Sequence, residues 1–157
     1  MDTKEYFIRL GQLVGNLQSL EFILRAYLQQ LPDSRPIGIP KGKDIYKYPV
    51  GSELPINEIT SRDTLGQLIA KHNKWAITQG EEKIEGSIVD LRDALAHGRV
   101  SALSPNDSLH LIKFGKPFNG KSKVRVVFNE ILSQEYLDQQ IKCVFNAITI
   151  VKEKLYS

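Results

Sequence analysis

The chain has 157 residues, of which 41% are hydrophobic and 25% are charged, a composition typical of one globular domain with a substantial core. The formal net charge of +3 is too small to identify a partner, and the single cysteine excludes a disulfide framework. No apolar run approaches the ~20 residues that span a bilayer, and the first residues do not resemble a signal peptide. We therefore expect one cytoplasmic domain over residues 1–157 that does not contact a membrane.

A long N-terminal helix is predicted by hydrophobic residues spaced alternately four and three apart from Tyr6 to Leu31. Glu21 falls in this helix where a hydrophobic residue is expected, and a carboxylate in that place needs a partner. Arg25, one turn later, would form a surface ion pair with it. Alternatively, Glu21 points toward the functional site described below.

Residues 32–57 hold five prolines and three glycines, a density that excludes a regular helix and predicts a long surface loop. The basic and aromatic residues at 41–48 could contact RNA bases. Packing of the tyrosines over the core explains the same residues.

The second helix is predicted by the spacing of Leu65 to Ala76, and it ends at Gly80, whose missing Cβ suits a left-handed cap. His72 occupies an apolar position on this helix, which is typical of a hydrogen-bonded core histidine. The third helix is predicted by the stripe from Ile84 to Leu95, and Gly98 follows its end. Its acidic first turn is expected to contain Glu81, Glu82 and Glu85.

An antiparallel β-meander is predicted at 99–128, because residues 99–103, 109–114 and 124–128 are rich in Val, Ile, Leu and Phe and are separated by turn formers. A fourth helix follows, with Ser133 as its N-cap and Cys143 as a buried, unreactive thiol. The predicted fold is therefore mainly α, a four-helix up-and-down bundle with the meander inserted between the third and fourth helices.

The meander is basic, since no acidic residue occurs between Ser108 and Asn129. Its cations are Lys113, Lys116, Lys121, Lys123 and Arg125. Contact with the phosphates of RNA is one interpretation of this stretch. The other is a solvated hairpin whose lysines discourage edge-to-edge strand pairing.

Arg92 and His97, near the end of the third predicted helix, are the most informative pair for function. An arginine fork fits phosphate oxygens, and an imidazole exchanges a proton near neutral pH. Asp93, one turn before His97, could hold the imidazole by a hydrogen bond. Equally, His97 could stabilise the helix C-terminus as a cation while Arg92 pairs with an acidic neighbour.

Other familiar chemistries lack their motifs. The chain has no phosphate-binding glycine-rich loop, no Gly-x-Ser-x-Gly elbow and no His-x-x-x-His pair. His72, His97 and His110 fall on three different elements, so the sequence predicts no metal site and no cofactor.

The segment from Leu91 to Gly98 resembles the signature of the HEPN superfamily, in which an arginine and a polar residue are followed by a histidine after a short interval. Arg92, Asp93 and His97 take these places, near the end of the third of four predicted helices. The architectural resemblance covers most of the chain, while the motif itself covers eight residues.

The resemblance implies a metal-independent endoribonuclease that acts as a homodimer, with the motif helices of two subunits meeting at one cleft. Arg92 and His97 would be catalytic, with support from Asp93 and Glu21. The candidate residues for RNA contact are Arg99, Lys113, Lys121, Lys123 and Arg125. Such a protein is expected in a toxin–antitoxin or phage-defence setting, with a cognate antitoxin or regulatory protein. The alternative is a catalytically inactive bundle that binds RNA or a protein partner.

The chain departs from one subset of that family. Members controlled by nucleotide transfer often carry a tyrosine two residues after the histidine, and this chain has Arg99 there. The departure argues against that type of control. Arg99 would either supply a third cation to the cleft or be a surface residue at the start of a strand.

Overall fold

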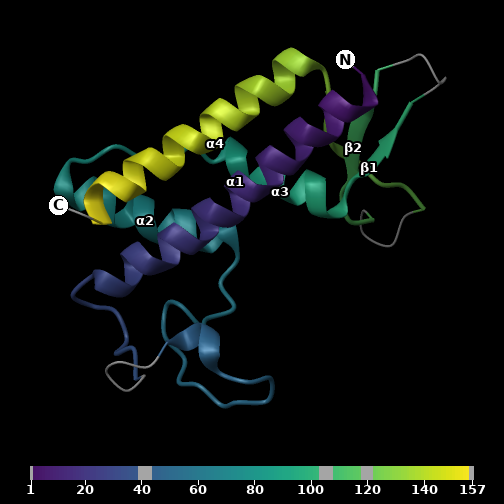
Figure 1. The fold of residues 1–157 in the computed structure, drawn as a ribbon. Coiled ribbons are helices and arrows are strands. Elements are labelled where there is room, and N and C mark those ends of the chain that lie inside the picture. Colours follow the sequence, from purple (N-terminus) through teal and green to yellow (C-terminus); the bar gives the residue numbers. More distant parts are fainter. Residues whose placement is uncertain (1, 39–43, 103–107, 118–121, 156–157) are drawn as a thin grey trace. The chain divides into compact units, whose positions relative to one another are not determined.

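The computed structural model describes residues 2–38, 44–102, 108–117 and 122–155. Within these ranges it is mainly helical, with a small antiparallel sheet between the last two helices (Figure 1). The elements are α1 (Thr3–Gln30), η1 (Ile45–Lys47), α2 (Leu65–Gln79), α3 (Ser87–His97), β1 (Arg99–Ser101), β2 (His110–Phe114), β3 (Val126–Ile131) and α4 (Gln134–Leu155). The predicted number and order of helices and the position of the insertion are confirmed for the described residues.

The chain divides into two compact units. The first, here called the sheet unit, comprises Met1–Gln18 and Glu85–Ala147, and the second, the loop unit, comprises Ser19–Ile84 and Ile148–Ser157. α1 and α4 each contribute residues to both units. The expectation of a single domain over residues 1–157 stays a prediction.

In the sheet unit, α1, α3, β2 and α4 all contribute buried aliphatic side chains. They include Leu13, Leu17, Ile88, Leu91, Leu111, Leu137 and Val144. An ion pair from Arg9 Nε to Asp138 Oδ1 at 2.8 Å joins α1 to α4. Ser133 is the N-cap of α4, as predicted, because its hydroxyl accepts a hydrogen bond from the backbone N–H of Tyr136.

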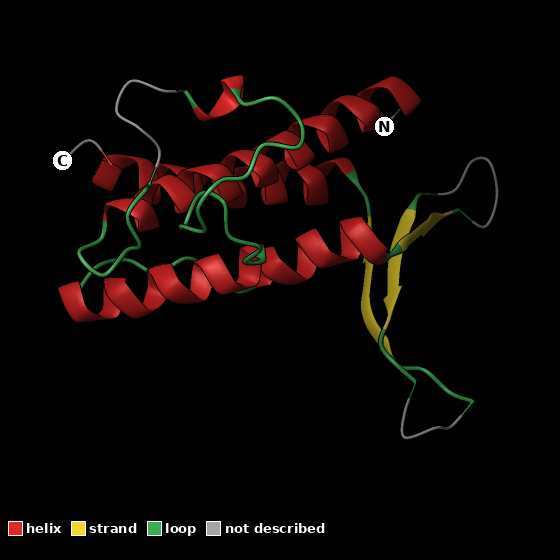
Figure 2. Cartoon of the chain, turned by 90° about the horizontal axis from the view of Figure 1, so that it is seen from below, coloured by secondary structure: helices red, strands yellow, loops and turns green. Residues whose placement is uncertain are grey.

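The sheet has the strand order β1-β2-β3, and both pairings are antiparallel (Figure 2). Arg99 pairs with Ile112, and Ile112 pairs with Asn129 on the next strand. An irregularity between Lys113 and Phe114 shifts the register near the end of β2. The predicted meander is confirmed, with β3 beginning two residues later than predicted and ending at Ile131.

Gly98 allows α3 to pass directly into the sheet. A Cβ at this position would lie 2.4 Å from the carbonyl oxygen of Ala94, 2.9 Å from Leu111 Cδ1 and 3.0 Å from the carbonyl oxygen of Ile112. The backbone of Gly98 is extended and donates to the Ala94 carbonyl. Glycine is therefore needed here for the close approach of α3 to β2, not for a left-handed cap.

The predicted start of α3 was wrong. The helix begins at Ser87, so Glu81, Glu82 and Glu85 precede it, and Asp90 is the acidic residue of its first turn. The physical reason lies in the loop unit, where the Asn73 amide donates to the Ile84 carbonyl and accepts from the Ile84 N–H, both at 2.8 Å. These bonds hold the backbone of Ile84 in a loop that precedes the helix. The side chain of Ile84 is nevertheless buried, so its apolar character reflects burial and not a helical conformation.

α2 of the loop unit begins with a capping box between Thr64 and Gln67 and ends at Gly80, which has the predicted left-handed conformation (φ 67°). His72 is fully buried beside the ring of Tyr27 and bonded to Asn73, so the core interpretation is confirmed. Of the 32–57 loop, residues 39–43 lie outside the described residues, including Lys41 and Lys43. The described remainder contains only the short helix η1 as a regular element.

Cys143 differs from its prediction as a buried thiol, since it is only partly buried on α4, with its Sγ 3.9 Å from Glu85 Oε2. No helix in the described part of the chain has both the length and the apolar character that crossing a bilayer requires.

Candidate functional site

Arg92 and Asp93 are half-buried on α3, and His97 is exposed in its last turn. Ile88, Leu91 and Ala94 form the buried stripe of this helix, and the helical period places the motif residues beside that stripe or opposite it. The Arg92 side chain retains 37% of its accessible surface, and His97 is exposed in the last turn. Both side chains therefore remain accessible to a ligand.

Asp93 connects the motif helix to the sheet. Its Oδ1 accepts a hydrogen bond from Arg92 Nη1 at 3.2 Å, and its Oδ2 lies 3.6 Å from Lys113 Nζ on β2. Arg92 thus has the acidic neighbour that the sequence allowed. Within the described residues, Asp93 makes no hydrogen bond to His97, so an orienting role for Asp93 stays a prediction.

Of the cations predicted to contact RNA, Lys113 reaches the motif helix directly. Arg99 begins β1 immediately after the turn at Gly98, and its guanidinium carbon lies 5.5 Å from the centroid of the Phe114 ring. Lys123 and Arg125 are exposed just before β3. Lys121 lies outside the described residues.

Of these side chains, Arg92 and Lys113 lie on either side of the Asp93 carboxylate, and His97 is exposed one turn further along α3. Arg92 and Lys113 share one carboxylate, so an incoming phosphate oxygen could replace Asp93 between them. His97 is open to solvent, where an imidazole can exchange protons with a bound substrate. Among the described residues, no three His, Cys, Asp or Glu side chains gather as metal ligands.

Glu21 has its partner in the loop unit. Its carboxylate accepts a hydrogen bond from Arg25 Nη2 at 3.0 Å. Arg25 also donates to the backbone carbonyls of Glu58, Ser61 and Asp63. The Glu21–Arg25 pair therefore holds residues 58–63 against α1, and a role for Glu21 toward Arg92 or His97 stays a prediction.

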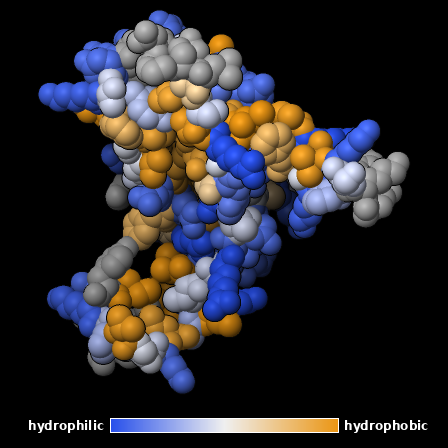
Figure 3. Space-filling model, turned by 90° about the vertical axis from the view of Figure 1, so that its right-hand side faces the viewer, coloured by the Kyte–Doolittle hydropathy of each residue, from blue (hydrophilic) through white to orange (hydrophobic). Residues whose placement is uncertain are grey.

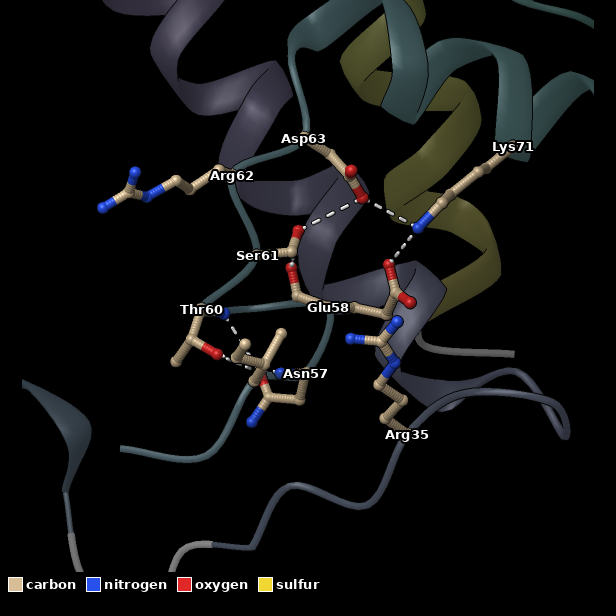
Figure 4. A pocket seen from close by; sticks show the side chains of 9 residues that line it. Arg35, Asn57, Glu58, Thr60, Ser61, Arg62, Asp63 and Lys71 are labelled. Carbon is tan, nitrogen blue, oxygen red and sulfur yellow. Dashed lines mark hydrogen bonds and ion pairs between the residues drawn. The ribbon is translucent and has the colours of Figure 1, made fainter. Parts of the chain in front are cut away.

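A polar pocket that sequence reasoning missed lies in the same unit, with a volume of about 590 Å³ (Figure 4). Lys71 bridges Glu58 and Asp63 at 2.8 Å each, while Arg62 extends away from them. The hydrogen bond from Lys71 lowers the pKa of Asp63, and the bonds to Asp63 and Glu58 raise the pKa of Lys71. These groups satisfy one another, and their scattered positions along the chain form no motif.

No family model, curated protein or solved structure matches the chain. α3 and the sheet belong to the same compact unit.

Proposed function

We propose that the chain is a metal-independent endoribonuclease of the HEPN type, with Arg92 and His97 as its catalytic residues. The observation that carries the proposal is the pair of cations on one carboxylate of α3, where Arg92 and Lys113 both contact Asp93, with His97 exposed in the last turn of the same helix. Cations that hold a phosphate next to a titratable imidazole are what cleavage of a phosphodiester requires.

In this reaction the 2′-oxygen of the RNA attacks the adjacent phosphorus while the bond from phosphorus to the 5′-oxygen breaks. His97 takes the 2′-hydroxyl proton or donates a proton to the departing 5′-oxygen. Arg92 binds the phosphate oxygens and offsets the negative charge that gathers on them in the transition state. The products carry a 2′,3′-cyclic phosphate and a 5′-hydroxyl. Because the substrate supplies its own nucleophile, DNA is not cleaved.

The proposal includes the quaternary arrangement that the resemblance implies. The four helices form an up-and-down bundle, and two copies meet through their α3 helices so that both Arg92–His97 pairs line one cleft. A monomer then carries half of the site. Such an enzyme fits a toxin–antitoxin or phage-defence setting, in which a cognate protein restrains cleavage.

The test is incubation of purified protein with single-stranded RNA in EDTA, comparing wild type with His97→Ala and Arg92→Ala. Arg62→Ala, which removes an exposed arginine from the other unit, is the matched control. We expect cleavage by wild type and the control, at least about 100-fold slower cleavage by both motif variants, and no cleavage where one 2′-deoxy nucleotide replaces the target. Full activity in both motif variants would refute the site.

The second candidate is a bundle that binds RNA or a protein without catalysis. The ion pair between Arg92 and Asp93 favours this second candidate, because the pair gives Arg92 a purely structural role. This candidate predicts RNA or partner binding that persists in His97→Ala and no cleavage by any variant. A protein that cleaves RNA only through His97 excludes it.

A further inference from the structure

One face of the sheet carries an exposed aromatic and cationic pair. Leu111 is 1% exposed, and Lys113 contacts Asp93, so the face that bears these two residues packs toward α3. Side chains alternate along a strand, and Arg99 is paired with Ile112. Arg99, Ile112 and Phe114 therefore lie on the opposite face, here called the outer face, which the contact between Arg99 and Phe114 confirms.

The outer face is open and carries the cation Arg99. Phe114 retains 39% of its accessible surface and Ile131, at the end of the neighbouring strand, retains 48%. Lys116 and Lys123 are exposed in the segment that joins β2 to β3. Glu130 pairs with Leu111 and so belongs to the inner face. Figure 3, which looks onto the side that carries the sheet, shows hydrophobic surface bordered by strongly hydrophilic surface.

This combination suits one kind of ligand. Nucleobases stack on aromatic rings and on arginine planes, while lysines neutralise the phosphates between the bases. The Arg99 guanidinium lies over the Phe114 ring, so a base that stacks on the guanidinium plane extends an existing stack, which Phe114 supports from below. Paired bases in an A-form duplex do not expose their faces, so only an unpaired strand can use this surface.

We propose that the outer face binds single-stranded RNA, with one base stacked on Phe114 and Arg99 and the flanking phosphates on Lys116 and Lys123. This inference rests on the proposed function for the choice of RNA, and it adds that the substrate is unpaired and is selected with little sequence preference. Arg99 follows His97 by two residues, a backbone reach of about 7 Å. The outer face therefore begins at the end of the helix that carries the motif.

The test measures binding without cleavage, by fluorescence anisotropy of a labelled 12-nucleotide RNA that is 2′-O-methylated throughout. We expect Phe114→Ala to weaken binding about 5-fold or more, because stacking of one base is lost, and Phe114→Trp to retain it. Ile131→Ala, which removes an exposed aliphatic side chain from the same face, should change binding less than about 2-fold. Thermal melting of each variant checks that the fold is intact.

The same strand annealed to its complement should bind more weakly than the single strand at equal salt concentration. Unchanged binding by Phe114→Ala, equal loss in Ile131→Ala, or preference for the duplex would overturn the inference. If wild type cleaves RNA and Phe114→Ala binds RNA as tightly as wild type, the role of the outer face is refuted and the catalytic proposal stands. Phe114-dependent binding without any cleavage would refute the catalytic proposal and leave the outer face standing.

Discussion

Lys113 of β2 lies with its Nζ 3.6 Å from Oδ2 of Asp93 on α3, so an ion pair joins the sheet to the motif helix. The same carboxylate accepts a hydrogen bond from Arg92. Because one acid serves two cations, the pair of positive charges is only partly neutralised. An RNA phosphate would compete with Asp93 for both of them.

Asp93→Asn should therefore strengthen the binding of 2′-O-methylated RNA, by about 2- to 5-fold, since exposed ion pairs contribute at most ~1 kcal/mol. Anisotropy titrations at two salt concentrations measure this change. Asp90→Asn, which removes an exposed carboxylate from the first turn of the same helix, is the matched control. A slower cleavage rate with unchanged affinity would instead assign Asp93 the role of orienting His97.

Gly98→Ala should destabilise the protein, by about 1–3 kcal/mol, because the added Cβ overlaps the Ala94 carbonyl and Leu111. The displacement of β2 should also lower RNA cleavage by separating Lys113 from Asp93. Urea unfolding measures the stability. Gly11→Ala is the control in the same unit, since no atom lies within 4 Å of its added Cβ, and it should stabilise α1 by roughly 0.5–1 kcal/mol. Equal stability of the Gly98 variant and wild type would contradict the packing argument.

His72 should make stability depend on pH. Burial lowers its pKa below the ordinary value of 6.5. As the pH falls below 6.5, the unfolded chain therefore binds a proton that the folded chain does not, and the free energy of unfolding decreases. The slope from this group is at most about 1.4 kcal/mol per pH unit.

Urea unfolding at several pH values between 5 and 8 checks the prediction. His72→Leu should flatten the curve in the window below pH 6.5, whereas His97→Gln, a change at an exposed histidine, controls for the loss of one imidazole. An identical pH dependence in wild type and His72→Leu would show that the buried ring is not the cause.

Arg25 should be a major stabilising residue of the loop unit. Its guanidinium donates to three backbone carbonyls and retains 12% of its side-chain surface. Arg25→Met leaves those carbonyls without their charged donor and should cost about 2–4 kcal/mol. Glu21→Gln keeps an acceptor for Arg25 and should cost less than ~1 kcal/mol. Chemical unfolding compares the two, and a larger loss in the Glu21 variant would reverse the assignment.

Cys143 should react slowly with iodoacetamide at pH 7.5, because burial and the adjacent Glu85 carboxylate raise the pKa of its thiol. Glu85→Gln removes that charge and should speed alkylation by about two- to five-fold. Mass spectrometry of timed samples follows the reaction, with Glu82→Gln as an exposed acidic control. An unchanged rate in Glu85→Gln would exclude this carboxylate as a cause.

Local patterns in the sequence were sufficient for the element order. Spacing of hydrophobic residues found the four helices, and Gly80 and Ser133 mark helix ends because caps act through bonds within a few residues. The start of α3 escaped this reasoning. Asn73, far along the chain, holds Ile84 in a loop, and no local pattern reports such a bond.

The sequence by itself determined that Arg92 and His97 share one helix and that the meander after them is basic, since both facts follow from spacing and composition. Only the tertiary structure decided which cations meet. Strand pairing set Lys113 on the face toward Asp93 and Arg99 with Phe114 on the outer face. A shift of one residue in register would have exchanged these faces, and register depends on contacts between strands that are distant in sequence.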